Sequence, residues 1–125
     1  MNEKEKPEDL KERTKRFALR MIRLYSTLPK TTAVQVLGKQ VLRAGTSVGA
    51  HYREGLRARS DAEVISKLEG ALQELEETAY WLELLIKSGV VKSELLKNLM
   101  GETGELTAIL ITCVKKVKAK PRGGK

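Results

Sequence analysis

More than ninety consecutive residues between Pro29 and Pro121 contain no proline. Proline is disfavoured inside helices because it lacks a backbone N–H and its ring clashes with the preceding turn. Through this stretch, and in the segment that precedes Pro29, apolar residues recur at steps of three and four, which is the spacing of one face of an α-helix. The sequence therefore predicts long helices rather than many short strands.

The ends of four helical segments are marked by residues that start or stop helices. Serine and threonine cap the first turn, a Ser-x-x-Glu sequence forms a capping box, and proline or glycine ends a helix. The connections near 57–60 and 89–93 are short, which favours antiparallel neighbours. We predict an all-α, antiparallel up-and-down four-helix bundle over residues 8–119, with a flexible N-terminal tail (1–7) and a basic C-terminal tail (120–125). In chain order the boundary residues are Pro29, Thr31 or Thr32, the Ser60 to Glu63 capping box, Gly89 and Ser93.

Few residues in the chain suit metal or redox chemistry. Cys113 is the only cysteine, so no intramolecular disulfide can form, and its helical spacing places it in the predicted core. His51 is the only histidine, which argues against a zinc site. No apolar run approaches the roughly 20 residues of a membrane span, and Met1 to Leu10 is charged rather than signal-like. We expect a cytoplasmic protein without membrane association, metal or cofactor.

Charge is distributed unevenly along the chain, whose formal net charge is +8. Residues 30–59 carry six basic side chains and one acidic one, whereas residues 60–89 carry two basic and seven acidic ones. The last thirteen residues add six positive charges and no negative ones. RNA or DNA is therefore a reasonable partner, although a charged tail is also typical of a solubilising end.

The segment 32–56 separates three kinds of residue onto three faces of a helix, at about 100° per residue. An apolar face points into the bundle, a second face carries Gly38, Gly45 and Gly49, and a third carries basic residues. Each glycine inside a helix costs about 1 kcal/mol relative to alanine, so three aligned glycines imply a compensating close contact. We favour a neighbouring helix of the same bundle as that contact, and another subunit is the alternative.

The basic face is interrupted only by Glu54. A row of exposed cations opposite a core is common on solvated helices. Cations four residues apart nevertheless repel one another by roughly a few tenths of a kcal/mol, so an anionic ligand or an acidic helix is expected to neutralise them. The sequence leaves both possibilities open. The basic residues are Lys39, Arg43, Arg53 and Arg57, and the acidic candidates, spaced by seven in the third segment, are Glu69, Glu76 and Glu83.

Trp81 lies about 150° from the centre of the predicted core face of the third segment, beside Leu85 and Thr78. A tryptophan-centred apolar cluster on an otherwise polar face is typical of an association hot spot. We therefore predict that Trp81 and Leu85 contact another subunit.

The run VLRAGTSVGAHYREGLRARSDAEVISKLEGALQELEETAYWLELLIKSGVV, residues 41–91, resembles the bacterial four-helix-bundle family named for proteins encoded in intervening sequences of 23S ribosomal RNA. The marks of the resemblance are the RAGTSVGA run, the REG that follows it, the RARS turn and the LEETAYWLE stretch. The family usually has asparagine at position 51, where this chain has His51. The resemblance implies a homopentameric ring. It extends to the accessory variability determinants of diversity-generating retroelements, which are basic pentamers that bind nucleic acid and a reverse transcriptase.

The expected function is that of a non-enzymatic, homo-oligomeric scaffold that binds RNA or DNA and assists a retroelement reverse transcriptase. The resemblance places the arginines around the RARS turn on the surface that meets nucleic acid or the polymerase. The expected oligomer-interface residues are Gly45, Gly49, Trp81 and Leu85. The expected nucleic-acid or partner-binding residues are Lys39, Arg43, Arg53, Arg57, Arg59, Lys115, Lys116, Lys118, Lys120 and Arg122.

Two alternatives use the same residues differently. A protein-binding adaptor would meet an acidic partner through its arginines without binding free nucleic acid. A small helical ribonuclease would use Arg43 with His51 as acid and base, but these two residues lie about 80° apart on the helix, with no second histidine in the chain. We therefore expect no enzymatic activity.

Overall fold

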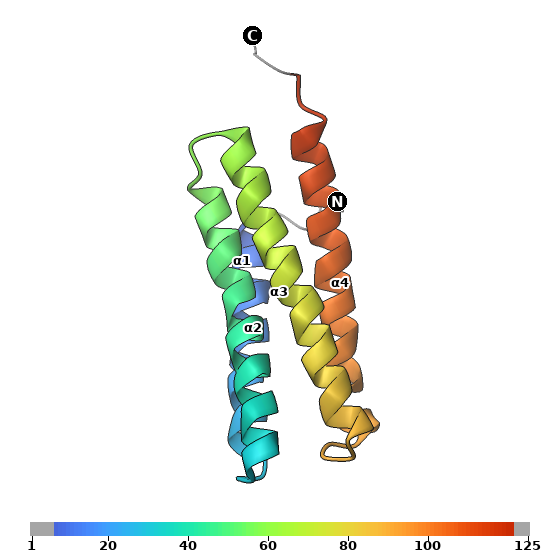
Figure 1. Ribbon diagram of the computed structural model, residues 1–125. Coiled ribbons are helices and arrows are strands. Elements are labelled where there is room, and N and C mark those ends of the chain that lie inside the picture. The colour runs from blue at the N-terminus through green and yellow to red at the C-terminus, as the bar shows by residue number, and fades with distance from the viewer. Residues whose placement is uncertain (1–6, 122–125) are drawn as a thin grey trace.

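Four antiparallel helices run up and down the molecule in chain order (Figure 1). The computed structural model describes residues 7–121 and the side chains of residues 9–121. The prediction of an all-α, up-and-down four-helix bundle is confirmed. Of the predicted tails, residue 7 begins the first helix, and residues 1–6 and 122–125 lie outside the described residues. The helices are α1 (Pro7–Thr27), α2 (Thr32–Leu56), α3 (Asp61–Lys87) and α4 (Ser93–Lys118).

Apolar side chains from all four helices fill the space between them. Phe17 and Met21 of α1 are at most 1% exposed and are among the largest side chains of this core. Three threonines are also buried, and each hydroxyl donates a hydrogen bond to the carbonyl four residues earlier, which satisfies its polar group. The buried threonines are Thr14, Thr78 and Thr103.

Among the helices of residues 7–121, none has an apolar stretch that could span a membrane.

The buried face of α3 is rotated relative to the predicted core line that includes Leu72 and Ala79, which are only half-buried. α3 packs against both α2 and α4. Its buried residues keep a heptad spacing and are Leu68, Ala71, Leu75, Thr78, Leu82 and Leu85. Thr78 and Leu85 therefore belong to the core and do not form an exposed cluster with Trp81.

The glycine face of α2 packs against α1. A Cβ atom added to Gly45 would lie 2.3 Å from Met21 Cγ, and one added to Gly49 would lie 3.1 Å from Thr14 Oγ1. Gly38 faces the end of α1 in the same way. The favoured interpretation of these glycines, close packing by a neighbouring helix of the same chain, is confirmed.

Local hydrogen bonds explain two of the helix ends. Ser60 Oγ accepts a hydrogen bond from the Glu63 backbone N–H at 3.1 Å, while the Glu63 carboxylate accepts one from the Arg59 N–H. Gly89, with φ of +81°, occupies the left-handed conformation just after α3. Ser93 was predicted to cap α4, but it is the first helical residue, because the capping position falls one residue earlier.

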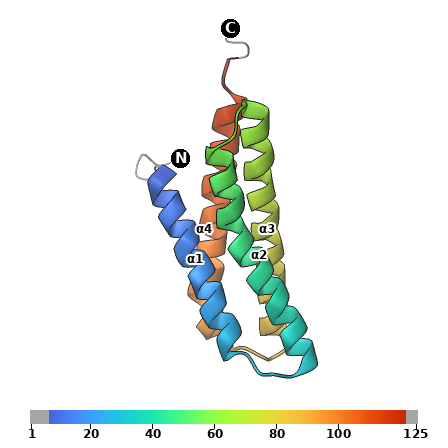
Figure 2. The same cartoon turned by 90° about the vertical axis from the view of Figure 1, so that its left-hand side faces the viewer.

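The helices do not all approach one another equally. α1 packs on α2, α2 on α3 and α3 on α4, while α1 and α4 approach less closely. Figure 2 shows the pair formed by α1 and α2 inclined relative to α3 and α4. A partly buried ion pair links α1 to α4, in which the Arg13 guanidinium donates to both oxygens of Glu102 at 2.7 and 2.8 Å. Arg13 also bonds Glu105.

Candidate nucleic-acid interface

Two basic groups that are far apart in the sequence lie at the same end of the bundle, at the top of Figure 1. One group belongs to the end of α2 and the turn that follows it, and the other to the last turn of α4 and the residues just beyond. The antiparallel topology brings them together, since α2 and α4 run in the same direction. We call the following residues the basic end: Arg53, Arg57, Arg59, Lys115, Lys116, Lys118 and Lys120.

Two ion pairs hold the end of α4 against the start of α3. Lys118 Nζ lies 3.3 Å from Glu69 Oε2, and Lys120 Nζ lies 3.4 Å from Asp61 Oδ1. All four side chains are more than half exposed, so each pair contributes at most about 1 kcal/mol to stability. Their effect is mainly positional, because they fix the last turn of α4 beside the turn between α2 and α3.

Other cations of the basic end have no carboxylate partner among the described residues. Within the same part of the chain Arg53 makes only a long hydrogen bond, from Nη2 to the Lys11 carbonyl oxygen at 3.4 Å. Lysines in the last turn of a helix are favoured by the helix dipole, which accounts in part for those of α4. The arginines of the turn lack that explanation, and a guanidinium group suits the geometry of a phosphate. Within residues 7–121 no ion pair is formed by Arg57, Arg59, Lys115 or Lys116.

Arg43, in the middle of α2, is neutralised by its own chain. Its Nη1 lies 3.2 Å from Glu74 Oε1, and its Nη2 lies against the carboxylate of Glu77. The hydrogen bond to Glu77 is the largest influence on the pKa of Arg43 and raises it, and Glu74 acts in the same direction. Acidic residues of α3 therefore occupy the position at which the sequence allows either an external anion or an acidic helix.

The three candidate glutamates spaced by seven on α3, Glu69, Glu76 and Glu83, are not the ones that reach Arg43. Glu69 pairs with Lys118 instead. Glu76 and Glu83 form no ion pair with the basic face of α2 in the part of the chain that is described. Of the two possibilities that the sequence leaves open for Arg43, an acidic helix is the one observed, but the candidate glutamates do not supply it, because α3 is turned so that another side meets α2.

Gly70 marks the side of α3 that does meet α2. A Cβ atom added to Gly70 would lie 3.1 Å from His51 Nδ1, so the two helices are close at this level. Glu74 and Glu77 follow at four and seven residues, on the same side of the helix. Gly70 is the sequence signal for this side of α3, because a glycine permits two helices to approach closely. It was not among the residues predicted from the sequence.

His51 lies between two carboxylates. Its Nε2 is 3.7 Å from Glu74 Oε2 and its Nδ1 is 3.7 Å from Glu54 Oε1. The Nδ1 atom is buried and makes no hydrogen bond to any described residue. Because Arg43 and His51 both approach Glu74, these side chains form one polar cluster that joins α2 to α3.

Two predicted binding residues lie apart from the basic end. Lys39 is one turn before Arg43, toward the start of α2, and forms no ion pair within residues 7–121. Arg122 lies outside the described residues. Arg43, which is neutralised, therefore separates Lys39 from the cations of the basic end, and the predicted basic face is not continuous.

Three of the four predicted interface residues are enclosed by their own chain. Gly45 and Gly49 face α1, and Leu85 is 0% exposed. They present no surface to a second subunit, and the interface prediction is corrected for them. Trp81 is half-buried, and its Nε1 is buried with no hydrogen-bond partner within residues 7–121. Its ring lies 5.1 Å from that of Tyr80, which is 53% exposed and was missed in the sequence.

Comparison with known proteins agrees with this architecture. Residues 8–112 match the family model described as 23S rRNA-intervening sequence protein. A crystal structure of a protein of unknown function from the S23 ribosomal protein family of Bacteroides thetaiotaomicron VPI-5482 is similar, with 38% sequence identity and a TM-score of 0.82. The match covers 87% of this chain and 97% of that chain. No curated protein matches the chain.

Proposed function

The chain belongs to the family of 23S rRNA-intervening sequence proteins, and from this premise we propose that it is a non-enzymatic, homo-oligomeric scaffold that binds RNA or DNA in the cytoplasm. The basic end is the binding surface. The observation that carries the proposal is the meeting of cations from two distant segments at this end, with Arg57 and Arg59 unpaired within the described chain. The family description, which refers to an RNA, supports the same class of ligand.

Binding through the basic end is binding to phosphates. Each lysine or arginine that contacts a phosphate releases condensed counterions, and this gain is independent of base sequence. Arg43 takes no part, because Glu74 and Glu77 already neutralise it. The affinity is therefore expected to be broad in sequence and sensitive to salt.

The proposal includes the assembly that the resemblance implies, a homopentamer. A ring would repeat the basic end five times on one particle, and linked weak sites give an avidity far above that of one site. On α3 the residues proposed to contact the neighbouring subunit are Tyr80, which is exposed, and Trp81 beside it. Aromatic side chains of this kind are enriched at the centres of interfaces.

A reverse transcriptase of a diversity-generating retroelement is the protein partner included in the proposal. The support for it is the resemblance of residues 41–91 and the basic character of the chain. Co-purification of such an enzyme with the chain, retained after nuclease treatment, is the expected result.

Filter binding of labelled RNA and DNA across a salt series tests the binding function. We expect binding at low salt that weakens steeply as salt rises. Absence of binding at low salt, or an affinity that does not change with salt, would reject the nucleic-acid function and leave the adaptor alternative.

Light scattering tests the assembly. The expected particle mass is five times the chain mass of 14.0 kDa. A particle with the mass of one chain would contradict the homo-oligomer.

A further inference from the structure

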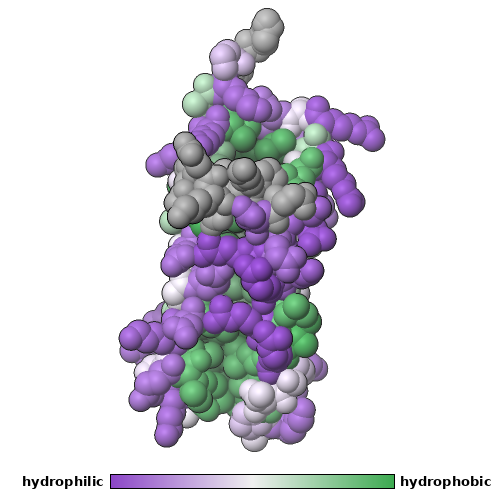
Figure 3. Space-filling view, turned by 180° about the vertical axis from the view of Figure 1, so that it is seen from behind, coloured by the Kyte–Doolittle hydropathy of each residue, from purple (hydrophilic) through white to green (hydrophobic). Residues whose placement is uncertain are grey.

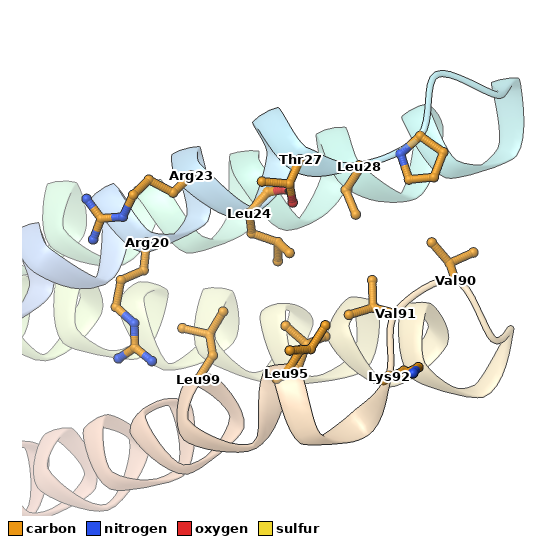
Figure 4. Close-up of a pocket in the computed structure, with 12 residues that line it drawn as sticks. Arg20, Arg23, Leu24, Thr27, Leu28, Val90, Val91, Lys92, Leu95 and Leu99 are labelled. Carbon is orange, nitrogen blue, oxygen red and sulfur yellow. The ribbon is translucent and has the colours of Figure 1, made fainter.

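A groove opens between α1 and α4 at the end of the bundle opposite to the basic end. It has a volume of about 880 Å³ and lies between the last turns of α1 and the first turns of α4, next to the turn that follows α3. Figure 4 shows side chains from α1 and from α4 pointing toward each other across it. The leucines of this groove are Leu24, Leu28, Leu95, Leu96 and Leu99, and Pro29, Val90 and Val91 complete the apolar lining.

The groove exists because α1 and α4 do not pack closely there. Each is held by its other neighbour, α1 by α2 and α4 by α3. The bond between Arg13 and Glu102 joins the two helices nearer the opposite end of the molecule. Leu95 is consequently 73% exposed, the highest value among the exposed large apolar residues. Apolar surface gathers in the lower half of Figure 3, where these helix ends lie, with hydrophilic side chains around it.

The charged residues that line the groove all have the same sign. Arg20 and Arg23 lie on the α1 side and Lys92 at the start of α4, and no acidic residue is among the lining residues. None of the three forms an ion pair with another residue of the described chain. An occupant of the groove must therefore combine an apolar surface with negative charge.

Each side of the groove carries two leucines four residues apart. Leu24 lies in the last turn of α1 and Leu28 just after its end, while Leu95 and Leu99 lie on α4. Leu28 and Leu99 are buried and form the floor, whereas Leu24 is partly exposed and Leu95 mostly exposed. Side chains at this spacing form the ridges between which the side chains of another helix insert. An incoming helix would bury its apolar face between these two rows, as in other complexes in which a helix lies in a groove.

We propose that this groove binds an amphipathic helix of a partner protein, with apolar residues on one face and carboxylates at its flanks. The apolar face covers Leu24 and Leu95, the lining leucines that are not already buried. The carboxylates pair with Arg20 and Arg23, whose planar guanidinium groups suit bidentate binding of a carboxylate. This inference goes beyond the proposed function, because it concerns a protein ligand at the end of the bundle that does not bind nucleic acid.

Fluorescence polarisation with two synthetic peptides tests the proposal on the full-length chain. Both are helical, about 16 residues long, with leucines on one face at i, i+3 or i+4, and i+7. One carries glutamates beside the leucines and the other carries lysines at the same positions. We expect the glutamate peptide to bind at least about tenfold more tightly than the lysine peptide, and the difference to shrink as salt rises.

Variants of the chain locate the binding. Arg20→Gln with Arg23→Gln should lower the affinity for the glutamate peptide about tenfold and remove most of the preference over the lysine peptide. Leu95→Ser should weaken both peptides without changing the circular dichroism spectrum, since this side chain is mostly exposed. Arg57→Gln with Arg59→Gln removes the same charge from the basic end and should leave peptide binding unchanged.

Three results would overturn the proposal. The two peptides could bind equally or not at all, or the variants of the groove could bind as the unmodified chain does. Alternatively, Leu95→Ser could dissociate a homo-oligomer in the absence of peptide, which would show that a second copy of the chain fills the groove. The variant Arg57→Gln with Arg59→Gln distinguishes this proposal from the proposed function. It should lose affinity for nucleic acid while it binds the glutamate peptide as the unmodified chain does.

Discussion

Gly45 of α2 lies so close to Met21 of α1 that a Cβ atom on the glycine would be 2.3 Å from Met21 Cγ. Met21 is completely buried, and its Sδ and Cε atoms also lie within 3.3 Å of that Cβ position. The absence of a side chain at Gly45 thus sets the distance between α1 and α2. The cost of a glycine within a helix is offset here by the close contact of two helices.

Gly45→Ala should destabilise the fold. Alanine gains about 1 kcal/mol of helix propensity, but overpacking a filled core costs about 1–3 kcal/mol and we expect the overpacking to dominate. Urea unfolding followed by circular dichroism measures the difference. Gly101→Ala is the matched control, because Gly101 is exposed on α4 with nothing within 4 Å of an added Cβ, and it should be neutral or stabilising by up to about 1 kcal/mol. Equal stability of Gly45→Ala and the unmodified chain would contradict the packing argument.

Ser60→Ala should lower the free energy of unfolding by about 1 kcal/mol, since it removes the hydrogen bond from the Glu63 N–H at the start of α3. Ser93→Ala provides the comparison, because Ser93 is inside the first turn of α4 and not at its capping position. Its expected effect is within about 0.5 kcal/mol. A loss from Ser93→Ala as large as that from Ser60→Ala would show that the assigned start of α4 is wrong.

The pair of Arg13 with Glu102 should couple more strongly than the pair of Arg43 with Glu77. The side chains of Arg13 and Glu102 are 19% and 18% exposed, and a partly buried charged hydrogen bond contributes about 1.5–3 kcal/mol. Arg43 is 49% exposed, which limits its coupling with Glu77 to about 1 kcal/mol or less. Double-mutant cycles in urea, with arginine changed to methionine and glutamate to glutamine, measure both energies. The reverse order of coupling energies would be inconsistent with the observed exposure.

The sequence was sufficient for the helices because their signals are local. Pro29, Gly89 and the Ser60 capping box each act within one turn of the chain, and the structure places the helix ends at or within a residue or two of them. The close contact of α1 with α2 was also foreseeable. Three glycines on one helix face have no other common explanation, and Gly45 and Gly49 both face α1.

The rotation of α3 could not be obtained from its own pattern. The apolar residues of this helix fit two adjacent heptad lines that share Leu68, Leu75 and Leu82. The structure buries the line that adds Ala71, Thr78 and Leu85. A small change in rotation decides which glutamates reach α2. For this reason Glu74 and Glu77 neutralise Arg43. The candidate glutamates spaced by seven, Glu69, Glu76 and Glu83, do not. The meeting of the two basic groups at one end, in contrast, follows from the antiparallel order of the helices alone.

The salt dependence of RNA binding by two charge-matched variants tests the central claim most directly. In the first variant four cations of the basic end that form no ion pair within the described chain are changed to glutamine: Arg57, Arg59, Lys115 and Lys116. In the second variant four lysines at the opposite end that likewise form no ion pair with a described residue are changed in the same way: Lys30, Lys87, Lys92 and Lys97.

The account predicts that the first variant binds RNA much more weakly than the unmodified chain. Its slope of log affinity against log salt should be smaller in magnitude by about one for each contacting cation removed, up to about four. The second variant should retain a slope close to that of the unmodified chain. Equal losses in both variants, or unchanged binding in the first, would contradict the assignment of the basic end as the nucleic-acid surface.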